Sequence, residues 1–425
     1  MTTAATRRDE KGTLTLGGVS LAGLTEVDGV GTPTYVYDLD GIAANAKALE
    51  AAFEDGPHLV AYAVKANSVG PIIRALGAQG CGADVVSGAE LVLAQRCGIA
   101  AEKIIYSGVA KTDAEIDLAL GAGEKGIRAI NVESVEVIVR VAARAKALGR
   151  VARITMRINP GVEEDVIDTH RHITTGHDDA KFGIPLSTLK DAIAAASAAA
   201  EHIRVVGVAA HAGSQLTAME SYLASARKVF DTAKSMRSHF QLELVDTGGG
   251  FGIDYGTGCP VAPADFIRAV RAAQRDAGIA DLALFCEPGR ALVGAQGVLL
   301  SRVIQVKVAP ERRWLMIDAG MNDLMRPALY QAFHRIVPVT MPAGATPTAM
   351  RVVGPVCESS DDFGVHELPT QPFEDVAILD AGAYGFSMAS RYNGRAVPAE
   401  MFLAGGKVSE IRARKPSTDW VDDRV

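Results

Sequence analysis

The sequence predicts an α/β fold, a (β/α)8 TIM-like barrel followed by a β-rich domain of the β-sandwich or barrel-like kind. Two observations carry this prediction. Between residues 59 and 286, eight short β-branched segments alternate with alanine-rich amphipathic segments, as in a barrel of parallel strands joined by helices. After residue 290 the segments are strand-like with few helices between them. We therefore predict a barrel domain at residues 38–290 and a β-rich domain formed by residues 1–37 and 291–425.

The predicted barrel strands are short and apolar. They lie at residues 59–64, 83–86, 104–106, 127–132, 152–158, 205–210, 242–246 and 282–286. Helices are predicted between them, among others at residues 87–97, 113–120, 134–148 and 218–240, and an earlier helix at 42–53. Asp40 is placed to cap that earlier helix. An open doubly wound sheet would give the same alternation, but no GxGxxG turn follows the first strand.

The β-rich domain is predicted from further short strands. They lie at residues 13–16, 34–37, 298–308, 314–318, 350–353, 376–379 and 401–411. The early strands join this domain because they have no place in the barrel. Residues 160–183 form a long interruption that contains Arg171, His172, His177 and Lys181, and we expect it to be a loop over the site. The polar residues 414–425 are expected to lack regular structure.

Composition excludes several classes of protein. The chain has 425 residues, 48% of them hydrophobic, which is enough for two domains. A net charge of −7 without a basic run argues against nucleic acid or a membrane surface as partners and favours small molecules. The first residues lack the apolar core of a signal peptide, so we expect a cytoplasmic protein. Five cysteines without CxxC spacing predict neither a disulfide framework nor a metal site.

Lys65 ends the first predicted barrel strand and would stand at its carboxyl end. A lone lysine after a strand is usually a solvated loop residue. Three later stretches change this interpretation, because each supplies a group that a lysine-bound pyridoxal phosphate needs: 248–250, 287–290 and 354–358. Together they make Lys65 the centre of a predicted cofactor site.

The barrel loops offer partners for each part of that cofactor. The glycines at 248–250 let backbone N–H groups turn toward a phosphate, although glycine runs also occur in plain turns. Glu287 suits the ring nitrogen, although a structural salt bridge would explain it equally well. His211 suits the ring face and Ser214 the phosphate, although His211 alone is more simply an ordinary core histidine. Asp84 and Arg157 lie near strand ends and are candidates for a supporting role.

The β-rich domain offers groups for a substrate. Arg326 and Tyr330 are four residues apart, so one face of a short helix can present both. The guanidinium groups of Arg290 and Arg326 suit bidentate capture of a carboxylate. Cys357 lies in a polar stretch beside Glu358, the setting in which a thiol is reactive and not merely buried.

Seven motifs in this order make the sequence similar to a known family. They are residues 62–67, 83–91, 181–183, 211–215, 287–290, 354–359 and 380–384. The chain resembles the fold-type III pyridoxal-phosphate decarboxylases, the group that acts on ornithine, diaminopimelate and arginine. The match runs from Thr32 to Lys407, and within the group it favours decarboxylation of meso-2,6-diaminopimelate to L-lysine and CO2.

The resemblance implies a role for each site residue. Lys65 would carry pyridoxal 5'-phosphate, Glu287 would meet its ring nitrogen and His211 would lie against its ring. The implied phosphate contacts are Ser214, Gly248, Gly249, Gly250 and Tyr384, with Gly289 and Arg290 close by. The implied substrate contacts are Arg290, Arg326, Tyr330, Glu358 and Tyr384. Cys357 would act as the catalytic acid from the partner subunit, so the resemblance implies a homodimer with shared active sites.

Three alternatives remain at this stage. An amino-acid racemase shares the barrel and cofactor, but that family places an arginine at the ring nitrogen where this chain has Glu287. A regulatory homologue without cofactor is disfavoured by Lys65, Glu287 and Cys357. A decarboxylase of ornithine, lysine or a secondary-metabolite precursor differs only in its substrate, which the sequence does not decide.

Overall fold

The structure is a computed structural model that describes residues 5–161, 181–256, 258–259 and 261–425. The chain forms two compact units. The sheet unit comprises residues 1–43, 253–258 and 292–425, and the barrel unit comprises residues 44–252 and 259–291. Residues 38–43 and 253–258, which the sequence assigned to the barrel domain, thus pack with the sheet unit. Of the predicted loop at 160–183, Arg171, His172 and His177 lie outside the described residues.

The barrel unit contains eight parallel strands in a closed ring. They are β5 (His58–Ala63), β6 (Gly82–Val85), β7 (Ile104–Tyr106), β8 (Ala129–Val132), β9 (Ala152–Asn159), β11 (Ile203–Ala209), β12 (Leu244–Asp246) and β13 (Ala283–Cys286). Each strand pairs with the next in this order, and β13 pairs with β5, so the ring closes. A two-residue strand, β10 (Ile184–Pro185), pairs with β9 outside the ring. The predicted barrel is confirmed, and the open sheet is excluded.

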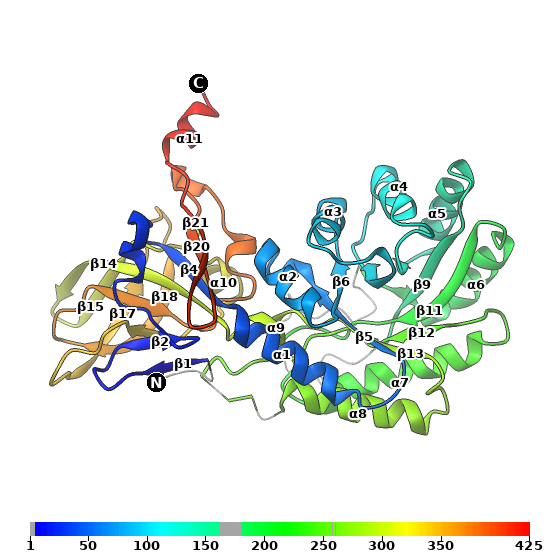
Figure 1. The fold of residues 1–425 in the computed structure, drawn as a ribbon, viewed down its shortest axis with the longest axis horizontal. Helices are drawn as coiled ribbons and strands as arrows, with labels where there is room; N and C mark the ends of the chain where they lie inside the picture. The colour runs from blue at the N-terminus through cyan, green and yellow to red at the C-terminus, as the bar shows by residue number, and fades with distance from the viewer. Residues whose placement is uncertain (1–4, 162–180, 257, 260) are drawn as a thin grey trace. The chain divides into compact units, whose positions relative to one another are not determined.

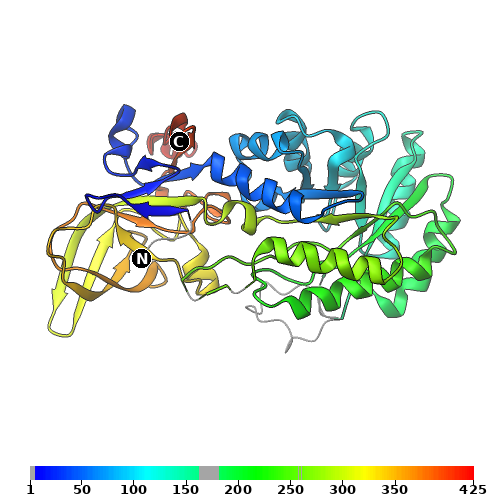
Figure 2. The same cartoon turned by 60° about the horizontal axis from the view of Figure 1, so that its bottom comes forward.

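Helices cover the outside of these strands (Figures 1 and 2). They are α2 (Gly70–Ala78), α3 (Gly88–Arg96), α4 (Asp113–Gly121), α5 (Val135–Ala147), α6 (Leu189–Ala198), α7 (Met219–Met236) and α8 (Pro263–Asp276). An earlier helix, α1 (Leu39–Ala52), begins before the predicted residue 42. The predicted cap at Asp40 is wrong, because Asp38 accepts the N–H groups of Asp40 and Gly41, each at 3.1 Å. Within the described residues, no helix has the length and apolar character needed to cross a bilayer.

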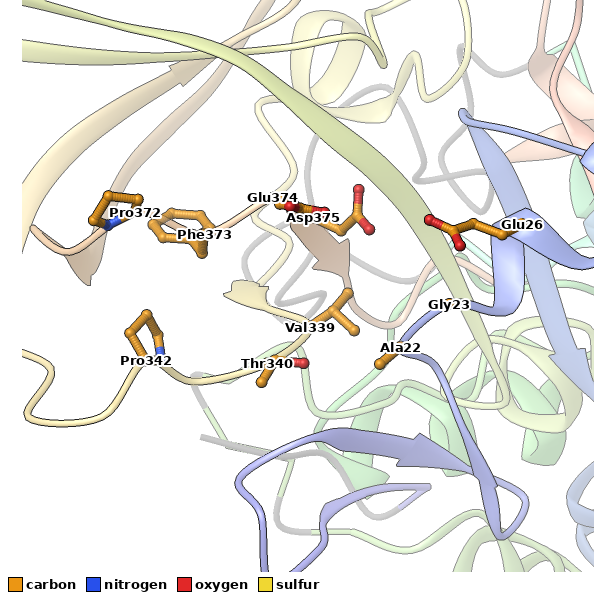
Figure 3. A pocket seen from close by; sticks show the side chains of 10 residues that line it. All are labelled: Ala22, Gly23, Glu26, Val339, Thr340, Pro342, Pro372, Phe373, Glu374 and Asp375. Carbon is orange, nitrogen blue, oxygen red and sulfur yellow. The ribbon is translucent and has the colours of Figure 1, made fainter.

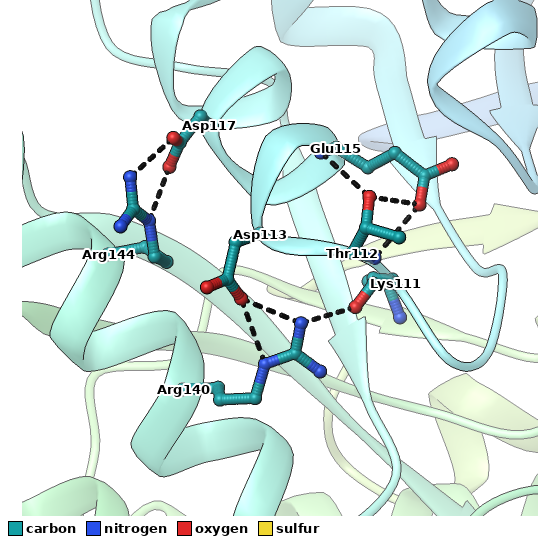
Figure 4. Close-up of polar contacts among 7 residues, drawn as sticks. All are labelled: Lys111, Thr112, Asp113, Glu115, Asp117, Arg140 and Arg144. Carbon is teal, nitrogen blue, oxygen red and sulfur yellow. Dashed lines mark hydrogen bonds and ion pairs between the residues drawn. The ribbon is translucent and has the colours of Figure 1, made fainter.

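Helices α4 and α5 illustrate how the sequence defines this outer layer (Figure 4). Thr112 and Glu115 form a capping box, in which each side chain accepts the other's backbone N–H and satisfies the exposed donors at the start of α4. Two ion pairs then join α4 to α5: Arg140 with Asp113 at 2.8 Å, and Arg144 with Asp117 at 2.5 Å. Because both pairs are open to solvent, the first about half exposed and the second about one third, each contributes only about 0.2–1 kcal/mol, so they align the helices more than they stabilise the barrel.

The interior of the barrel changes character from one end to the other. Side chains two apart on a strand share a face, and four such pairs have an apolar residue followed by a polar one. These pairs are Ile105 and Ser107, Ala129 and Asn131, Leu244 and Asp246, and Phe285 and Glu287; the apolar member of each belongs to one buried core cluster. At the amino ends of the strands, Glu243 instead pairs with three guanidinium groups, those of Arg128, Arg153 and Arg204. The buried polar groups therefore gather at the carboxyl ends.

The sheet unit is built on nine strands. They are β4 (Thr34–Asp38), β14 (Gly297–Ala309), β15 (Arg312–Ile317), β16 (Ile336–Pro338), β17 (Pro347–Val353), β18 (Asp362–Pro369), β19 (Asp375–Ile378), β20 (Ala399–Ala404) and β21 (Lys407–Arg412). A smaller sheet contains β1 (Thr6–Arg8), β2 (Leu14–Leu16) and β3 (Val19–Ser20). Strand β4 lies between β14 and β20, which confirms that the N-terminal strands join the β-rich domain.

The sheet unit differs from the sequence prediction in several details, among them the strands β16 and β18, which were not predicted. The single strand predicted at 401–411 is wrong, because Gly405 and Gly406 both adopt left-handed φ angles and turn the chain between β20 and β21. The C-terminal residues expected to lack regular structure contain a short helix, α11 (Thr418–Asp422). Two further short helices, α9 (Arg290–Val293) and α10 (Arg326–Tyr330), carry predicted site residues at their first positions.

Candidate active site

Lys65 lies at the carboxyl end of β5, in a single helical turn formed by residues Val64–Ala66. Its side chain is about one third exposed (35%), and its Nζ atom is 2.5 Å from Oδ2 of the fully buried Asp84 on the neighbouring strand β6. The other oxygen of Asp84 has no hydrogen-bond partner among the described residues. Asp84, predicted only as a supporting residue, is thus the ion-pair partner of the lysine.

Glu287 follows β13 and is buried in the barrel mouth. Ser107 donates a hydrogen bond of 2.9 Å to its Oε1 atom. Burial raises the pKa of Glu287 well above its usual value, and the nearby carboxyl groups of Asp246 and Asp84 raise it further. Burial likewise raises the pKa of Asp246 to about 6. The site therefore holds a carboxyl group with an unusually high proton affinity next to the lysine.

The glycine turn after β12 leaves no room for side chains. Gly248 and Gly250 have left-handed φ angles of 69° and 93°. A Cβ atom added to Gly249 would lie 2.0 Å from the carbonyl oxygen of Glu287. The turn is therefore a backbone-lined wall beside Glu287, the kind of surface that accepts an anionic group.

His211 and Ser214 follow β11 and face this turn and Arg290. His211 Nδ1 accepts the N–H of Gly249 at 3.2 Å. Burial, together with the positive charges of Arg157 and Lys65, lowers the pKa of His211 to about 3, so the ring is neutral near neutral pH. Arg290 donates from Nη2 to Ser214 Oγ at 3.0 Å, which places a guanidinium beside a hydroxyl.

Gly289 brings the two turns of the site together. A Cβ atom at this position would lie 2.8 Å from Cβ of Ala66, so a larger residue would push the turns apart. The N–H of Ala63 donates to the carbonyl oxygen of Pro288 at 3.1 Å. The barrel unit thus brings Lys65, His211, Ser214, Gly248, Gly249, Gly250, Glu287, Gly289 and Arg290 to its carboxyl end.

These residues fit pyridoxal phosphate. The group requires an amine, an anion-accepting wall with a guanidinium, a partner for its ring nitrogen and a flat neighbour for its ring. Lys65, the glycine turn with Arg290, Glu287 and His211 are chemically suited to these four tasks. Arg290 Nη2 and Ser214 Oγ lie 3.0 Å apart, so two groups suited to a phosphate stand side by side.

Apart from Arg290, the predicted substrate residues belong to the sheet unit. Arg326 begins α10, is buried, and places Nη1 2.6 Å from Nε2 of His334. The same guanidinium lies over the ring of Tyr255 at 4.7 Å from its centre. Tyr330 ends the same short helix, as predicted from the spacing of four. Tyr384 adopts a left-handed φ of 56°.

Cys357 and Glu358 lie together on an exposed loop of the sheet unit. The N–H of Cys357 donates to Oδ1 of Asn393 at 2.8 Å, and the hydroxyl of Tyr392 donates to Oε1 of Glu358 at 2.6 Å. Cys81 and Cys286 are buried, whereas Cys357 is exposed, so its thiol is accessible within its unit. All five cysteines are free.

Several residues that the sequence analysis did not single out take part in these arrangements. Ser107 holds Glu287, and Asn131 holds Ser107 through a bond of 3.0 Å from its amide nitrogen. His334 holds Arg326, while Arg335 pairs at 2.8 Å with Asp380, whose pKa burial raises to about 6. Ser107 and Asn131 could have been found from the alternation of apolar and polar residues in the strands. His334 carries no such signal.

A separate pocket of about 300 Å³ lies in the sheet unit (Figure 3). It is lined by Ala22, Gly23, Glu26, Val339, Thr340, Pro342, Pro372, Phe373, Glu374 and Asp375. Asp375 is paired with Arg302 at 3.1 Å. None of the predicted site residues lines this pocket, and it carries no group suited to the chemistry above.

Comparison with known proteins identifies the family of this chain. Residues 39–294 match the family model of the pyridoxal-dependent decarboxylases, over their pyridoxal-binding domain. The chain belongs to this family of pyridoxal-dependent decarboxylases. The predicted fold, enzyme class and cofactor are thereby confirmed.

Within the family the similarity is to one kind of enzyme. The chain is 40% identical to the diaminopimelate decarboxylase of Zymomonas mobilis, over 92% of each chain. It is 38% identical to that of Pseudomonas aeruginosa, over 94% of this chain and 93% of the relative. The crystal structure of the Helicobacter pylori diaminopimelate decarboxylase with L-lysine matches with a TM-score of 0.86 and 37% identity, covering 94% of this chain and 98% of that one. The crystal structure of the M. jannaschii diaminopimelate decarboxylase with L-lysine matches with a TM-score of 0.89 and 36% identity, covering 100% of this chain and 99% of that one.

Proposed function

We propose that this protein decarboxylates meso-2,6-diaminopimelate to L-lysine and CO2, with pyridoxal phosphate bound to Lys65. The observation that carries the proposal is the meeting of Lys65, Asp84 and Glu287 at the carboxyl end of the barrel, with Asp84 2.5 Å from the lysine amine and Glu287 buried nearby. The named relatives, which cover over nine-tenths of the chain, support the choice of substrate.

When bound, the cofactor supplies an electron sink for the carbanion that remains after CO2 leaves. In this proposal Glu287 would hold the ring nitrogen and favour a proton there, and the neutral His211 would lie against the ring. Arg290, Ser214, Gly248–Gly250 and Tyr384 would hold the phosphate, with Gly289 close by. A carboxyl group at the ring nitrogen keeps the ring protonated, which makes it a strong electron acceptor and favours decarboxylation. A racemase instead benefits from a ring that accepts electrons less strongly.

The sheet unit supplies groups that recognise the substrate and a group that protonates the carbanion. In this proposal Arg326 or Arg290 would pair with the distal carboxylate, Glu358 would pair with the distal ammonium, and Tyr330 and Tyr384 would contact the substrate. The thiol of Cys357 gives a proton to the carbanion. We propose that this thiol serves the barrel of a partner subunit, so that a homodimer holds two shared active sites in the cytoplasm.

Product analysis on a panel of amino acids tests the proposed function. Purified protein with pyridoxal phosphate is expected to release CO2 and form L-lysine from meso-diaminopimelate. Release of CO2 chiefly from ornithine or lysine would support the related decarboxylase instead. Inversion of an amino acid without CO2 release would support a racemase and contradict the proposal.

A further inference from the structure

Four polar side chains form a buried chain of hydrogen bonds across the barrel interior. Thr155 on β9 donates to the amide oxygen of Asn131 on β8. The amide nitrogen of Asn131 donates to Ser107 Oγ at 3.0 Å, and Ser107 donates to Glu287 Oε1 at 2.9 Å. Ser107, Asn131 and Thr155 are each at most 5% exposed. The chain therefore ends on the carboxylate that faces the cofactor site.

The direction of donation along this chain is determined by its chemistry. The amide of Asn131 has one accepting and one donating end, and the Thr155 hydroxyl satisfies the accepting end. The donating end then occupies a lone pair of Ser107, whose single proton points on to Glu287. The backbone of Asn131 is held in turn by Lys111, whose Nζ donates to its carbonyl oxygen at 2.7 Å. Glu287 thus receives a donated hydrogen bond from a preset direction.

Stability alone does not account for these residues. A buried hydrogen bond contributes a net ~0.5–1.5 kcal/mol, and replacing both partners with apolar groups of the same shape is often neutral. The residues two positions earlier on the same face are apolar: Ile105 precedes Ser107, and Ala129 precedes Asn131. An apolar continuation would pack equally well, but it would give Glu287 no donor.

We propose that Ser107 and Asn131 are positioning residues for Glu287, which they orient through Oε1 so that Oε2 is left to the ring nitrogen of the cofactor. The orientation toward the ring nitrogen rests on the proposed function. The hydrogen bond between Ser107 and Glu287 does not.

Glu287 is surrounded by other charged and titratable groups, which set the background for this effect. They are Asp246 on β12, Asp84 on β6, Arg157 on β9 and Lys65 after β5, with Cys286 and Tyr222 also nearby. Burial and the two aspartates raise the pKa of Glu287, whereas Lys65 and Arg157 lower it. A donor at Oε1 stabilises the ionised form, so its removal raises the pKa of Glu287 further.

The sign of the effect on stability follows from that direction. A carboxyl group whose pKa is higher in the folded than in the unfolded protein favours folding when protonated, and this stability is lost as the pH rises through the folded pKa. Ser107→Ala raises the folded pKa of Glu287 and leaves the unfolded pKa unchanged. The variant should therefore lose more stability than wild type as the pH rises from about 4.5, the ordinary pKa of the group, through the raised pKa of Glu287 in the folded protein.

The first experiment measures the melting temperature of the full-length, cofactor-free protein across this pH range. The melting temperature of Ser107→Ala should fall more steeply with rising pH than that of wild type. Ser225→Ala is the matched control, because Ser225 is fully buried and its hydroxyl has no hydrogen-bond partner among the described residues. In a Glu287→Gln background, Ser107→Ala should add no pH dependence. The proposal would be overturned if the melting temperature of Ser107→Ala changed with pH as it does in wild type. It would also be overturned if Ser107→Ala added pH dependence in the Glu287→Gln background.

The second experiment uses the enzyme loaded with pyridoxal phosphate. Ser107→Ala should lower kcat roughly 10-fold or more, the scale of a lost hydrogen bond to a charged group, and leave KM nearly unchanged. An unchanged kcat, or a rise in KM alone, would overturn the positioning role. If the stability test succeeds while wild type forms no lysine from meso-diaminopimelate, the proposed function fails and the bond between Ser107 and Glu287 stands.

Discussion

Arg326 and His334 form a buried pair in which the histidine is the acceptor. Nη1 of Arg326 lies 2.6 Å from Nε2 of His334, and Nδ1 of His334 lies 2.9 Å from the carbonyl oxygen of Leu379. Because a carbonyl oxygen only accepts, Nδ1 carries the proton and the Nε2 lone pair faces the guanidinium. A neutral histidine therefore orients the arginine that we assign to the substrate carboxylate.

Replacing His334 should weaken substrate binding more than turnover. His334→Leu removes the acceptor and frees the guanidinium to turn, so KM for meso-diaminopimelate should rise roughly 10-fold while kcat changes little. His334→Gln retains an acceptor oxygen and should stay nearer wild type. His366→Leu is a control, since His366 is also buried in this unit and its ring bonds the backbone carbonyl of Phe363 at 2.9 Å, not an arginine. Steady-state kinetics on the three variants checks this, and an unchanged KM in His334→Leu would contradict it.

Lys65→Ala should abolish decarboxylation and the absorbance of lysine-bound cofactor together, because no other group takes the place of its amine. Lys111→Met removes a second lysine of the same barrel, one that bonds the backbone of Asn131, and should keep the absorbance. Spectra and CO2 release measured on the same preparations provide the test. Substantial turnover with bound cofactor in Lys65→Ala would show that another residue carries it.

Gly249→Ala should prevent cofactor binding. The added Cβ atom would meet the carbonyl oxygen of Glu287 at 2.0 Å, and neither backbone segment can retreat without opening the site. Gly121→Ala is the matched control, because nothing lies within 4 Å of a Cβ atom there and its φ is not left-handed. That control should be neutral or more stable by about 0.4–1 kcal/mol. Titration with pyridoxal phosphate compares the two, and equal affinities would refute the close contact.

The enzyme should prefer meso-diaminopimelate to lysine or ornithine. Lysine lacks the distal carboxylate and would leave a guanidinium unpaired, and a site built to pair a substrate group can reject its absence by roughly 10⁴-fold. The ratio of kcat/KM values for the substrates measures this preference. Comparable values would remove the roles of Arg290 and Arg326 in substrate choice.

Mixing two inactive variants should restore activity if the site is shared between subunits. Lys65→Ala and Cys357→Ala each disable one half of the site, and a mixed dimer would hold one intact site and one doubly defective site. Random exchange makes about half of the dimers mixed, so activity should approach roughly a quarter of wild type. A mixture that exchanges subunits yet stays as inactive as its parents would place Lys65 and Cys357 in one chain.

The sequence alone determined the fold class and the order of its parts. The strand positions were predictable because each barrel strand is a short apolar run bounded by polar or glycine residues, which is a local signal. The placement of Lys65, Glu287 and the glycines at 248–250 after strands was predictable for the same reason, since parallel strands present their carboxyl ends at one face of a barrel.

Only the tertiary structure decided which of these side chains meet. Asp84 pairs with Lys65 from 19 residues away, and Ser107 bonds Glu287 across 180 residues. Such contacts depend on the register in which the strands pair and on closure between β13 and β5, and no local pattern carries that information. The same reason explains the tautomer of His334, because the carbonyl oxygen that fixes it belongs to Leu379, 45 residues further along the chain.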